Sequence, residues 1–390
     1  MPTPAPSAFR RLRAAIGAGA VLAVGTVALT ACATPVAPGS GASTGPSIVA
    51  TTTQVGDFTR ALVGESAEVT QLLVPGQSAH GFDPSAAQLL ALAGADALVV
   101  NGAGLESWLD DAVTASGFDG VLIDASQGIE LFGTDDHDDD TDHSDADDHS
   151  EADDHSADDH AEDDHAEDDH DDADDDHAED DNAGDHSDDA DDHAGHDHGE
   201  GNPHIWTDPA MAVQMVQNIG DGLESVSGVD SATVAANEET YLAKLEALDA
   251  WIEQNVSTVP VQQRVLVTNH DAFTYFVHAY DVTFVGSVIP SFDDNAEPSA
   301  AEIDALVADI RSTGVQAVFS EASLSPKAAE TIAREAGVAV YSGSDALYGD
   351  SLGTVGSDGD TYLGAQEHNA RLILESWGVT PSPLPELLRG

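Results

Sequence analysis

The sequence predicts an α/β protein of two lobes, each with a mostly parallel sheet flanked by helices, joined by one long rigid helix. Short apolar runs alternate with helical patterns along the chain, which is typical of parallel strands joined by right-handed crossovers. This alternation occurs twice, before and after one long Ala-rich helical pattern, and 390 residues suffice for two ordinary domains. We therefore expect lobes at 47–230 and 258–390, with the connecting helix at 231–257.

The first lobe is expected to contain four strands and four helices. Gly64 provides a helix end, Ser85 and Gln88 form a capping box, and Asp208-Pro209 combines an N-cap with a proline in the first turn. The expected strands are 47–52, 69–74, 97–100 and 121–124, and the expected helices are 58–64, 85–93, 108–116 and 209–226.

The second half repeats the pattern after the helix expected over 231–256, which would extend roughly 35–40 Å at ~1.5 Å per residue. Ser299 and Glu302 form another capping box, and Ser325-Pro326 opens a further helix. The expected strands are 264–268, 283–287, 316–320 and 338–341, and the expected helices are 272–280, 299–312, 325–336 and 361–377.

The N-terminus has the form of an export signal. A basic region with Arg10, Arg11 and Arg13 precedes an apolar stretch over 14–28, which is too short to span a bilayer of ~30 Å as a helix. Small residues before the single cysteine, Cys32, resemble a bacterial lipoprotein signal. That resemblance implies cleavage after residue 31, lipid attachment at Cys32 and a tether over 32–46; the alternative is a free structural cysteine. Arg10-Arg11 is only a weak sign of twin-arginine export.

An acidic, histidine-rich segment interrupts the first lobe at 135–201. It holds 12 of the 17 histidines and 35 acidic residues without a lysine or arginine. Such a segment has almost nothing apolar to bury, so we expect a disordered loop that gathers metal through imidazole and carboxylate groups. The collecting histidines we single out are His155, His160, His165, His170, His193, His196 and His198.

The formal charge of −62 argues against a nucleic-acid partner, because such binding needs clustered lysine and arginine. The chain outside the acidic segment is acidic as well, and no lysine or arginine occurs between Arg60 and Lys244.

Four ordered residues are candidate metal ligands. His80, His270 and Asp350 follow expected strands, and His204 directly precedes an expected helix. Ligands of open α/β sheets bind beyond the carboxyl ends of strands, so all four can face one cleft. Three imidazoles and one carboxylate would form a tetrahedral shell that suits Zn²⁺.

Each candidate has an ordinary structural alternative. His80 could be solvated, His204 could be the last histidine of the acidic run, His270 could cap a helix, and Asp350 could belong to a turn. Five further polar residues are assigned structural roles. His278 and His368 lie inside expected helices, and Glu297, Ser299 and Glu321 are interpreted as boundary or capping residues.

A set of motifs resembles the zinc-uptake solute-binding proteins of bacterial ABC transporters. The motifs are Pro75-Gly76…His80…Asp83-Pro84, Asn202-Pro-His204-Ile-Trp206-Thr-Asp-Pro209, Asn269-His270-Asp-Ala-Phe273…Tyr275-Phe276, Glu297-Pro-Ser299 and Tyr348-Gly-Asp350-Ser-Leu.

The resemblance covers about 47–377 and implies metal ligands at His80, His204, His270 and Asp350. Manganese-binding relatives typically carry Glu at the third position, so His270 favours Zn²⁺. Many relatives place a proline before the first histidine, where this chain has Ala79.

The expected function is therefore capture of extracytoplasmic Zn²⁺ by a lipid-anchored monomer that delivers it to an ABC permease and its ATPase, with only small, loop-level opening of the lobes. The acidic segment would raise the local metal concentration through weak multivalent contacts. The alternatives are a manganese-binding relative, a metal-buffering or cell-adhesion lipoprotein, and a zinc hydrolase. The sequence has no His-Glu-x-x-His motif for the last of these.

Overall fold

The computed structural model describes residues 45–132, 201–289 and 296–389, which all belong to one compact unit, Ser43–Gly390. The expected lipoprotein signal with Cys32 and the seven singled-out histidines of the acidic segment lie outside the described residues. Among the residues that are described, no helix is long and apolar enough to cross a membrane.

The first lobe is built on a four-stranded parallel sheet in the order β2-β1-β3-β4. Strands β1 and β3 occupy the centre, and their side chains are buried on both faces, as a parallel sheet covered by helices requires. The strands are β1 (Ser47–Ala50), β2 (Glu68–Gln71), β3 (Ala97–Val100) and β4 (Val121–Asp124).

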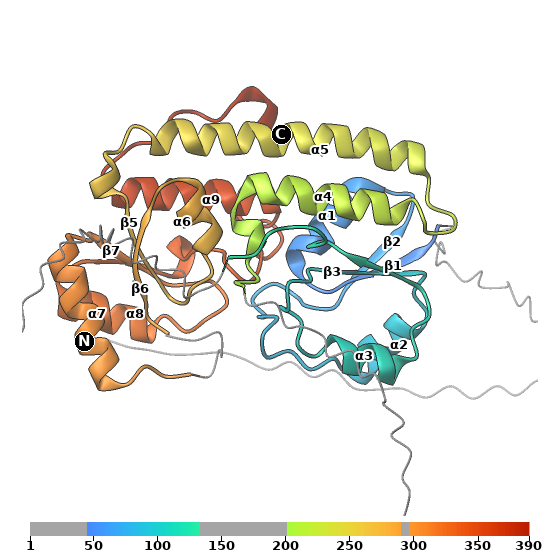
Figure 1. Ribbon diagram of the computed structural model, residues 1–390, viewed down its shortest axis with the longest axis horizontal. Coiled ribbons are helices and arrows are strands. Elements are labelled where there is room, and N and C mark those ends of the chain that lie inside the picture. The colour runs from blue at the N-terminus through green and yellow to red at the C-terminus, as the bar shows by residue number, and fades with distance from the viewer. Residues whose placement is uncertain (1–44, 133–200, 290–295, 390) are drawn as a thin grey trace, which may run out of the picture. The chain divides into compact units, whose positions relative to one another are not determined.

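Helices cover both faces of this sheet (Figure 1). On one face lie α1 (Thr53–Val63) and α4 (Pro209–Leu223), and on the other lie α2 (Ala86–Ala93) and α3 (Leu109–Ser116). The capping box at Ser85 is present, and Asp208 caps α4 with Pro209 in the first turn, as predicted.

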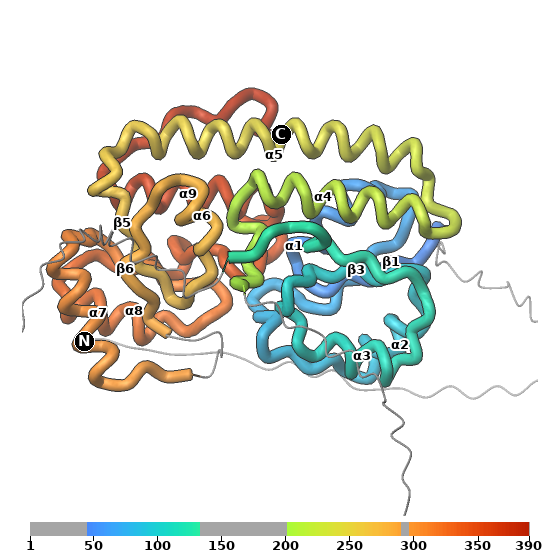
Figure 2. Tube along the Cα trace, in the orientation of Figure 1, coloured from blue at the N-terminus to red at the C-terminus, as the bar shows by residue number. Residues whose placement is uncertain are grey.

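One helix, α5 (Ser231–Val256), runs along both lobes, as the trace in Figure 2 shows. From Tyr241 on, its buried apolar residues recur every three or four positions, and those of the whole helix enter two different cores. Val234, Tyr241 and Leu245 pack into the first-lobe core, whereas Leu248 and Ile252 pack into a core of the second lobe. The helix thereby buries one continuous stripe against both lobes.

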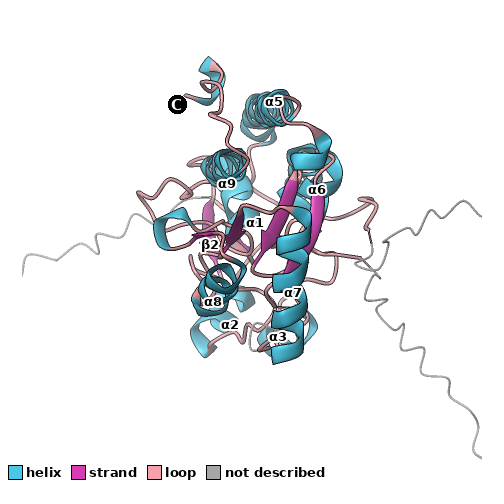
Figure 3. Ribbon diagram, turned by 90° about the vertical axis from the view of Figure 1, so that its left-hand side faces the viewer, coloured by secondary structure: helices cyan, strands magenta, loops and turns pink. Residues whose placement is uncertain are grey.

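The second lobe contains two parallel strand pairs, with β5 and β7 as neighbours. The strands are β5 (Val265–Thr268), β6 (Thr283–Ser287), β7 (Ala317–Phe319) and β8 (Ala339–Tyr341). The helices are α6 (Thr274–Ala279), α7 (Ala300–Thr313), α8 (Lys327–Ala336) and α9 (Tyr362–Ser376). Seen end-on in Figure 3, α5 and α9 lie on the same side of the strands, with α7 and α8 on the other side.

The predicted fold class is confirmed. The differences concern the ends of elements and the second lobe, whose described strands form two parallel pairs. Helix α1 begins at Thr53, five residues before the expected start, because the hydroxyl of Thr52 accepts a hydrogen bond from the amide of Val55 and caps the helix there. Several strands are one or two residues shorter than their apolar runs, since those runs continue into buried loops.

Candidate metal centre

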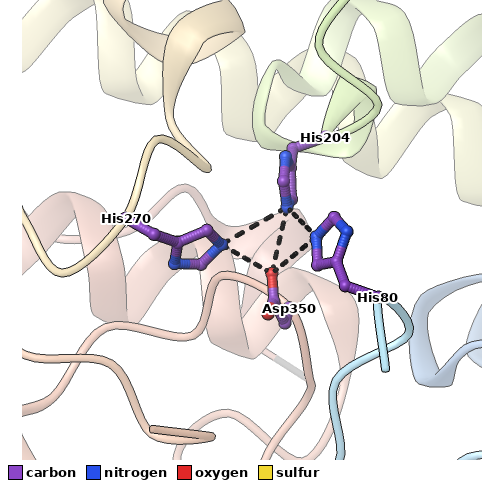
Figure 4. Close-up of side chains that lie close together, drawn as sticks. All are labelled: His80, His204, His270 and Asp350. Carbon is purple, nitrogen blue, oxygen red and sulfur yellow. Dashed lines mark hydrogen bonds and ion pairs between the residues drawn. The ribbon is translucent and has the colours of Figure 1, made fainter. Parts of the chain in front are cut away.

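The structure brings the four sequence-predicted ligands together (Figure 4). His80 lies in the loop after β2, His270 two residues after β5, and Asp350 in the loop after β8. His204 directly precedes the short 3-10 helix η1 (Ile205–Thr207), which leads into α4. One ligand atom from each residue lies within 4.8 Å of every other.

The individual distances correspond to a small coordination shell. The Nε2 atom of His204 lies 3.1 Å from that of His80 and 3.4 Å from that of His270. The Oδ1 atom of Asp350 lies 3.0 Å from His204 Nε2, 2.9 Å from His270 Nε2 and 4.0 Å from His80 Nε2. Tetrahedral zinc with bonds near ~2.0–2.1 Å separates its ligands by about 3.3 Å, so these four atoms are spaced closely enough to share one cation.

The four candidate ligands differ in exposure. The side chains of His204, His270 and Asp350 are 0%, 2% and 2% exposed, whereas that of His80 is 11% exposed. His80 is therefore the candidate ligand nearest solvent, and the other three are held inside the protein.

Partners on the far side of two imidazoles orient them toward the centre. His204 Nδ1 lies 2.8 Å from Asn202 Oδ1, and His270 Nδ1 lies 2.6 Å from Glu321 Oε2. When Nδ1–H donates outward, Nε2 presents its lone pair to the cluster, which is the tautomer that a metal needs.

Glu321 corrects the sequence interpretation, which treated it as a boundary or capping residue. It is 4% exposed, and besides its contact with His270 its Oε1 atom accepts a hydrogen bond of 2.5 Å from the backbone amide of Asp350. One carboxylate therefore supports two of the four candidate ligands. Its position directly after the apolar run of β7 was the available signal, because strand ends face the cleft.

A buried oxygen in the cluster lacks a partner in the part of the chain that the structure describes. Asp350 Oδ2 is inaccessible to solvent and makes no hydrogen bond there. A buried carboxylate oxygen is costly when it is unpaired, and a cation held by this carboxylate would relieve that cost. The donor set therefore fits a bound metal ion.

The electrostatics of the cluster also favour a cation. Burial lowers the pKa of His204. Burial also disfavours the charged form of His270, but Asp350 and Glu321 outweigh it and raise the pKa of His270 well above its ordinary value. Burial alone would raise the pKa of Asp350, yet the neighbouring His270 and His204 hold that pKa well below its usual range. Without metal, a proton on His270 balances the buried carboxylates.

The loop that carries His80 is fastened by Trp108. The indole Nε1 donates a 2.9 Å hydrogen bond to the carbonyl of Ala79, directly before His80. Phe82 packs edge-on against the same indole, with ring centroids 4.9 Å apart. Sequence reasoning assigned no role to Trp108, which only the fold brings to this loop.

The two histidines assigned structural roles stay outside the cluster. His278 lies on α6 with its ring 4.6 Å from that of Phe132, and His368 Nε2 lies 3.0 Å from the carbonyl of Ala346.

A family model and individual relatives both match this chain to metal-binding proteins. The family described as zinc-uptake complex component A, periplasmic (ZnuA), matches residues 48–376. The manganese-binding lipoprotein MntA of Halalkalibacterium halodurans is 24% identical over 325 residues, which are 83% of this chain and 86% of that protein. The zinc-binding protein AdcA of Streptococcus pyogenes is 28% identical over 297 residues, 75% of this chain, and the match spans 48% of AdcA.

Solved structures share the fold. A periplasmic zinc-binding protein, TroA from Treponema pallidum, superposes with a TM-score of 0.64 at 20% identity, covering 85% of this chain and 99% of TroA. A manganese-bound periplasmic metal-binding protein from Candidatus Liberibacter asiaticus gives a TM-score of 0.63 at 17% identity, with coverage of 85% and 99%.

Proposed function

The chain belongs to the family of the zinc-uptake complex component A (ZnuA), and from this membership we propose that it captures Zn²⁺ outside the cytoplasm and delivers it to a membrane permease. It is a metal-binding substrate-binding protein of an ABC transporter. Proteins of this family bind and release their cargo rather than transform it, so the hydrolase alternative does not apply.

One observation carries the proposal for the site. Three imidazole nitrogens, from His80, His204 and His270, and one carboxylate oxygen, from Asp350, lie within 4.8 Å of one another. We assign these four residues as the ligands of the transported ion. Outward partners on two of the imidazoles preorganise them for this role.

The same ligand set supports zinc as the cargo. Imidazole-rich tetrahedral sites suit Zn²⁺, whereas Mn²⁺ favours oxygen ligands and six-fold coordination. Manganese is the second candidate, because MntA, named as manganese-binding, aligns over 86% of its length. Asp350 Oδ2, which has no hydrogen-bond partner among the described residues, could supply one more oxygen to such an ion.

We also propose how the protein is anchored, how it collects metal and how it is divided into lobes. We assign Cys32 as the lipidated residue of a membrane-anchored monomer, and the histidine-rich segment 135–201 as the collector of metal. The relatives named as lipoproteins support the anchor. We divide the chain into lobes at 47–230 and 258–390 around the connecting helix, and the partners are the permease and its ATPase.

The assignment is tested by removing one ligand. His270→Ala should weaken binding of one Zn²⁺ per chain on the order of 100-fold or more, because a ligand contributes at least as much as its supporting contacts. His278→Ala is the matched control, since its ring lies outside the cluster. Affinity is measured by competition with a metal chelator, in the whole chain and in a chain lacking 135–200. The deletion should leave one tight site. Unchanged one-to-one affinity in His270→Ala would refute the assignment.

The metal is identified by competition between Zn²⁺ and Mn²⁺ for the same protein. Zinc should displace manganese, and protein purified from its native cell envelope should contain zinc. If the protein retains Mn²⁺ in preference to Zn²⁺, the cargo is manganese and not zinc, and the proposed role in metal transport still holds.

A further inference from the structure

The loop that carries Asp350 belongs to the second half of the chain but is fastened to the first lobe. Leu352 is part of the first-lobe hydrophobic core. The carbonyl of Gly349 accepts a 3.0 Å hydrogen bond from the indole of Trp206, and the amide of Gly76 donates a 2.8 Å hydrogen bond to the hydroxyl of Ser351.

Two consecutive residues at the start of α1 hold this loop on both sides of Asp350. Gln54 Nε2 donates a 3.1 Å hydrogen bond to the carbonyl of Gly349, the residue before Asp350. The amide of Leu352, two residues after Asp350, donates a 2.9 Å hydrogen bond to Thr53 Oγ1.

The two holding side chains also fix each other. Thr53 Oγ1 lies 2.8 Å from Gln54 Oε1. An amide oxygen can only accept, so the hydroxyl of Thr53 donates to it and keeps its lone pairs for Leu352. Gln54 Nε2 is thereby directed at Gly349, and the chain of hydrogen bonds has only one consistent direction.

Burial makes the hydrogen bonds of Thr53 and Gln54 to the Asp350 loop costly to lose. Thr53 is 3% exposed and Gln54 is 1% exposed, so water does not compete for their hydrogen bonds. Both residues stand in the first turn of α1, whose start is fixed by the Thr52 cap. The contacts therefore transmit the position of a rigid first-lobe helix to the loop of Asp350.

We propose that Thr53 and Gln54 are positioning residues for the metal ligand Asp350, so that a first-lobe helix holds a ligand supplied by the second half of the chain. The inference rests on the proposed function of the four-residue cluster. Its consequence is specific, because the Asp350 oxygen stands 2.9–3.0 Å from two imidazoles and a shift of about 0.5 Å spoils such a site.

The test is a double-mutant cycle in the whole chain, with Zn²⁺ affinity measured by chelator competition. Gln54→Leu and Thr53→Val each remove the polar contact and keep a similar shape. Each should weaken zinc binding about threefold to tenfold, the range expected for one buried hydrogen bond. Thr59→Val is the matched control, because Thr59 is also a buried threonine of α1 but its hydroxyl donates to the carbonyl of Val55 and not to the Asp350 loop.

A positioning role and a purely structural role predict different effects on zinc affinity when Asp350 is already replaced by Ala. There, Gln54→Leu should change zinc affinity less than twofold, because the ligand it positions is gone. The visible absorption of bound Co²⁺, intense in tetrahedral coordination, should weaken in Gln54→Leu and Thr53→Val and stay unchanged in Thr59→Val. Thermal unfolding of the metal-free variants shows whether each one folds.

The affinity of Asp350→Ala distinguishes a failure of the proposed metal site from a failure of the positioning role. If Asp350→Ala binds zinc as tightly as the unmodified chain, Asp350 is not a ligand and the proposed site fails. If Asp350→Ala weakens binding but Gln54→Leu and Thr53→Val do not, or if their effects persist in the Asp350→Ala background, the positioning role is wrong and the site stands.

Discussion

Replacing Glu321 with Gln keeps all four candidate ligands and removes the carboxylate that orients two of them. The Glu321 carboxylate faces two donors that belong to candidate ligand residues, His270 Nδ1 at 2.6 Å and the amide of Asp350 at 2.5 Å. It also accepts from the hydroxyl of Ser323 at 3.1 Å. A carboxylate can accept from all three, because both of its oxygens are acceptors.

Glutamine cannot replace that arrangement. If its oxygen accepts from the amide of Asp350, its NH₂ group faces His270 Nδ1. The imidazole must then move its proton to Nε2, which leaves no lone pair for metal. If the amide flips, the buried amide of Asp350 loses its partner instead, at a cost of about 1–3 kcal/mol.

The expected effect is a loss of Zn²⁺ affinity of about 10- to 100-fold, the range for such outer partners. This equals about 1.4–2.8 kcal/mol, which agrees with the cost of one unpaired buried donor. The assay is chelator competition at several pH values. Because the Glu321 carboxylate helps to raise the pKa of His270, the pH dependence of binding should also move to lower pH in Glu321→Gln.

Glu302→Gln provides the control, since Glu302 completes an exposed capping box in which glutamine serves equally well. It should leave zinc binding unchanged. If Glu321→Gln binds zinc with the affinity and pH profile of the unmodified chain, Glu321 does not orient His270 and Asp350 for metal.

Three further predictions follow from the described structure. Trp108→Phe removes the indole donor that fastens the loop of the candidate ligand His80, so zinc release into excess chelator should accelerate about threefold to tenfold. Trp377→Phe removes a similar indole-to-carbonyl bond elsewhere and should not change release. Because the pKa of His270 is raised, metal must displace its proton, and zinc affinity should fall up to tenfold per pH unit below that pKa. Calorimetry in buffers of different ionisation enthalpy should detect the released proton at pH 7. If no proton is released on zinc binding, His270 is not protonated in the metal-free protein. Leu98→Ala, at a fully buried position of β3, should lower the free energy of unfolding by about 2–5 kcal/mol, whereas Leu90→Ala at a largely exposed position should change it by less than about 0.5 kcal/mol in denaturant titrations.

Local signals explain why most elements could be predicted. Capping boxes at Ser85 and Ser299 and the Asp208-Pro209 start depend on neighbours within four residues, and the structure shows all three. The connecting helix expected at 231–257 matches α5 to within one residue, since its long Ala-rich pattern with spaced leucines is a local signal. The start of α1 was missed because a threonine cap inside an apolar run has no distinct pattern.

The candidate ligands were also accessible to sequence reasoning, because strand ends in α/β sheets converge on one edge. Their supporting partners were not. Glu321 contacts His270 across 51 positions of sequence, and Gln54 contacts Gly349 across 295. No spacing rule connects such residues, and either one read alone is an ordinary polar residue at the end of an element.

The sequence by itself therefore determined the type of each element, the alternating α/β order and the histidines and carboxylate available for metal, because these depend on short-range patterns and on residue chemistry. Only the tertiary structure decided the strand order β2-β1-β3-β4, the sharing of α5 between two cores and the carboxylate, amide and indole groups that orient the cluster. The physical reason is that ligand geometry within tenths of an ångström arises from contacts between distant segments, which packing creates and local sequence does not encode.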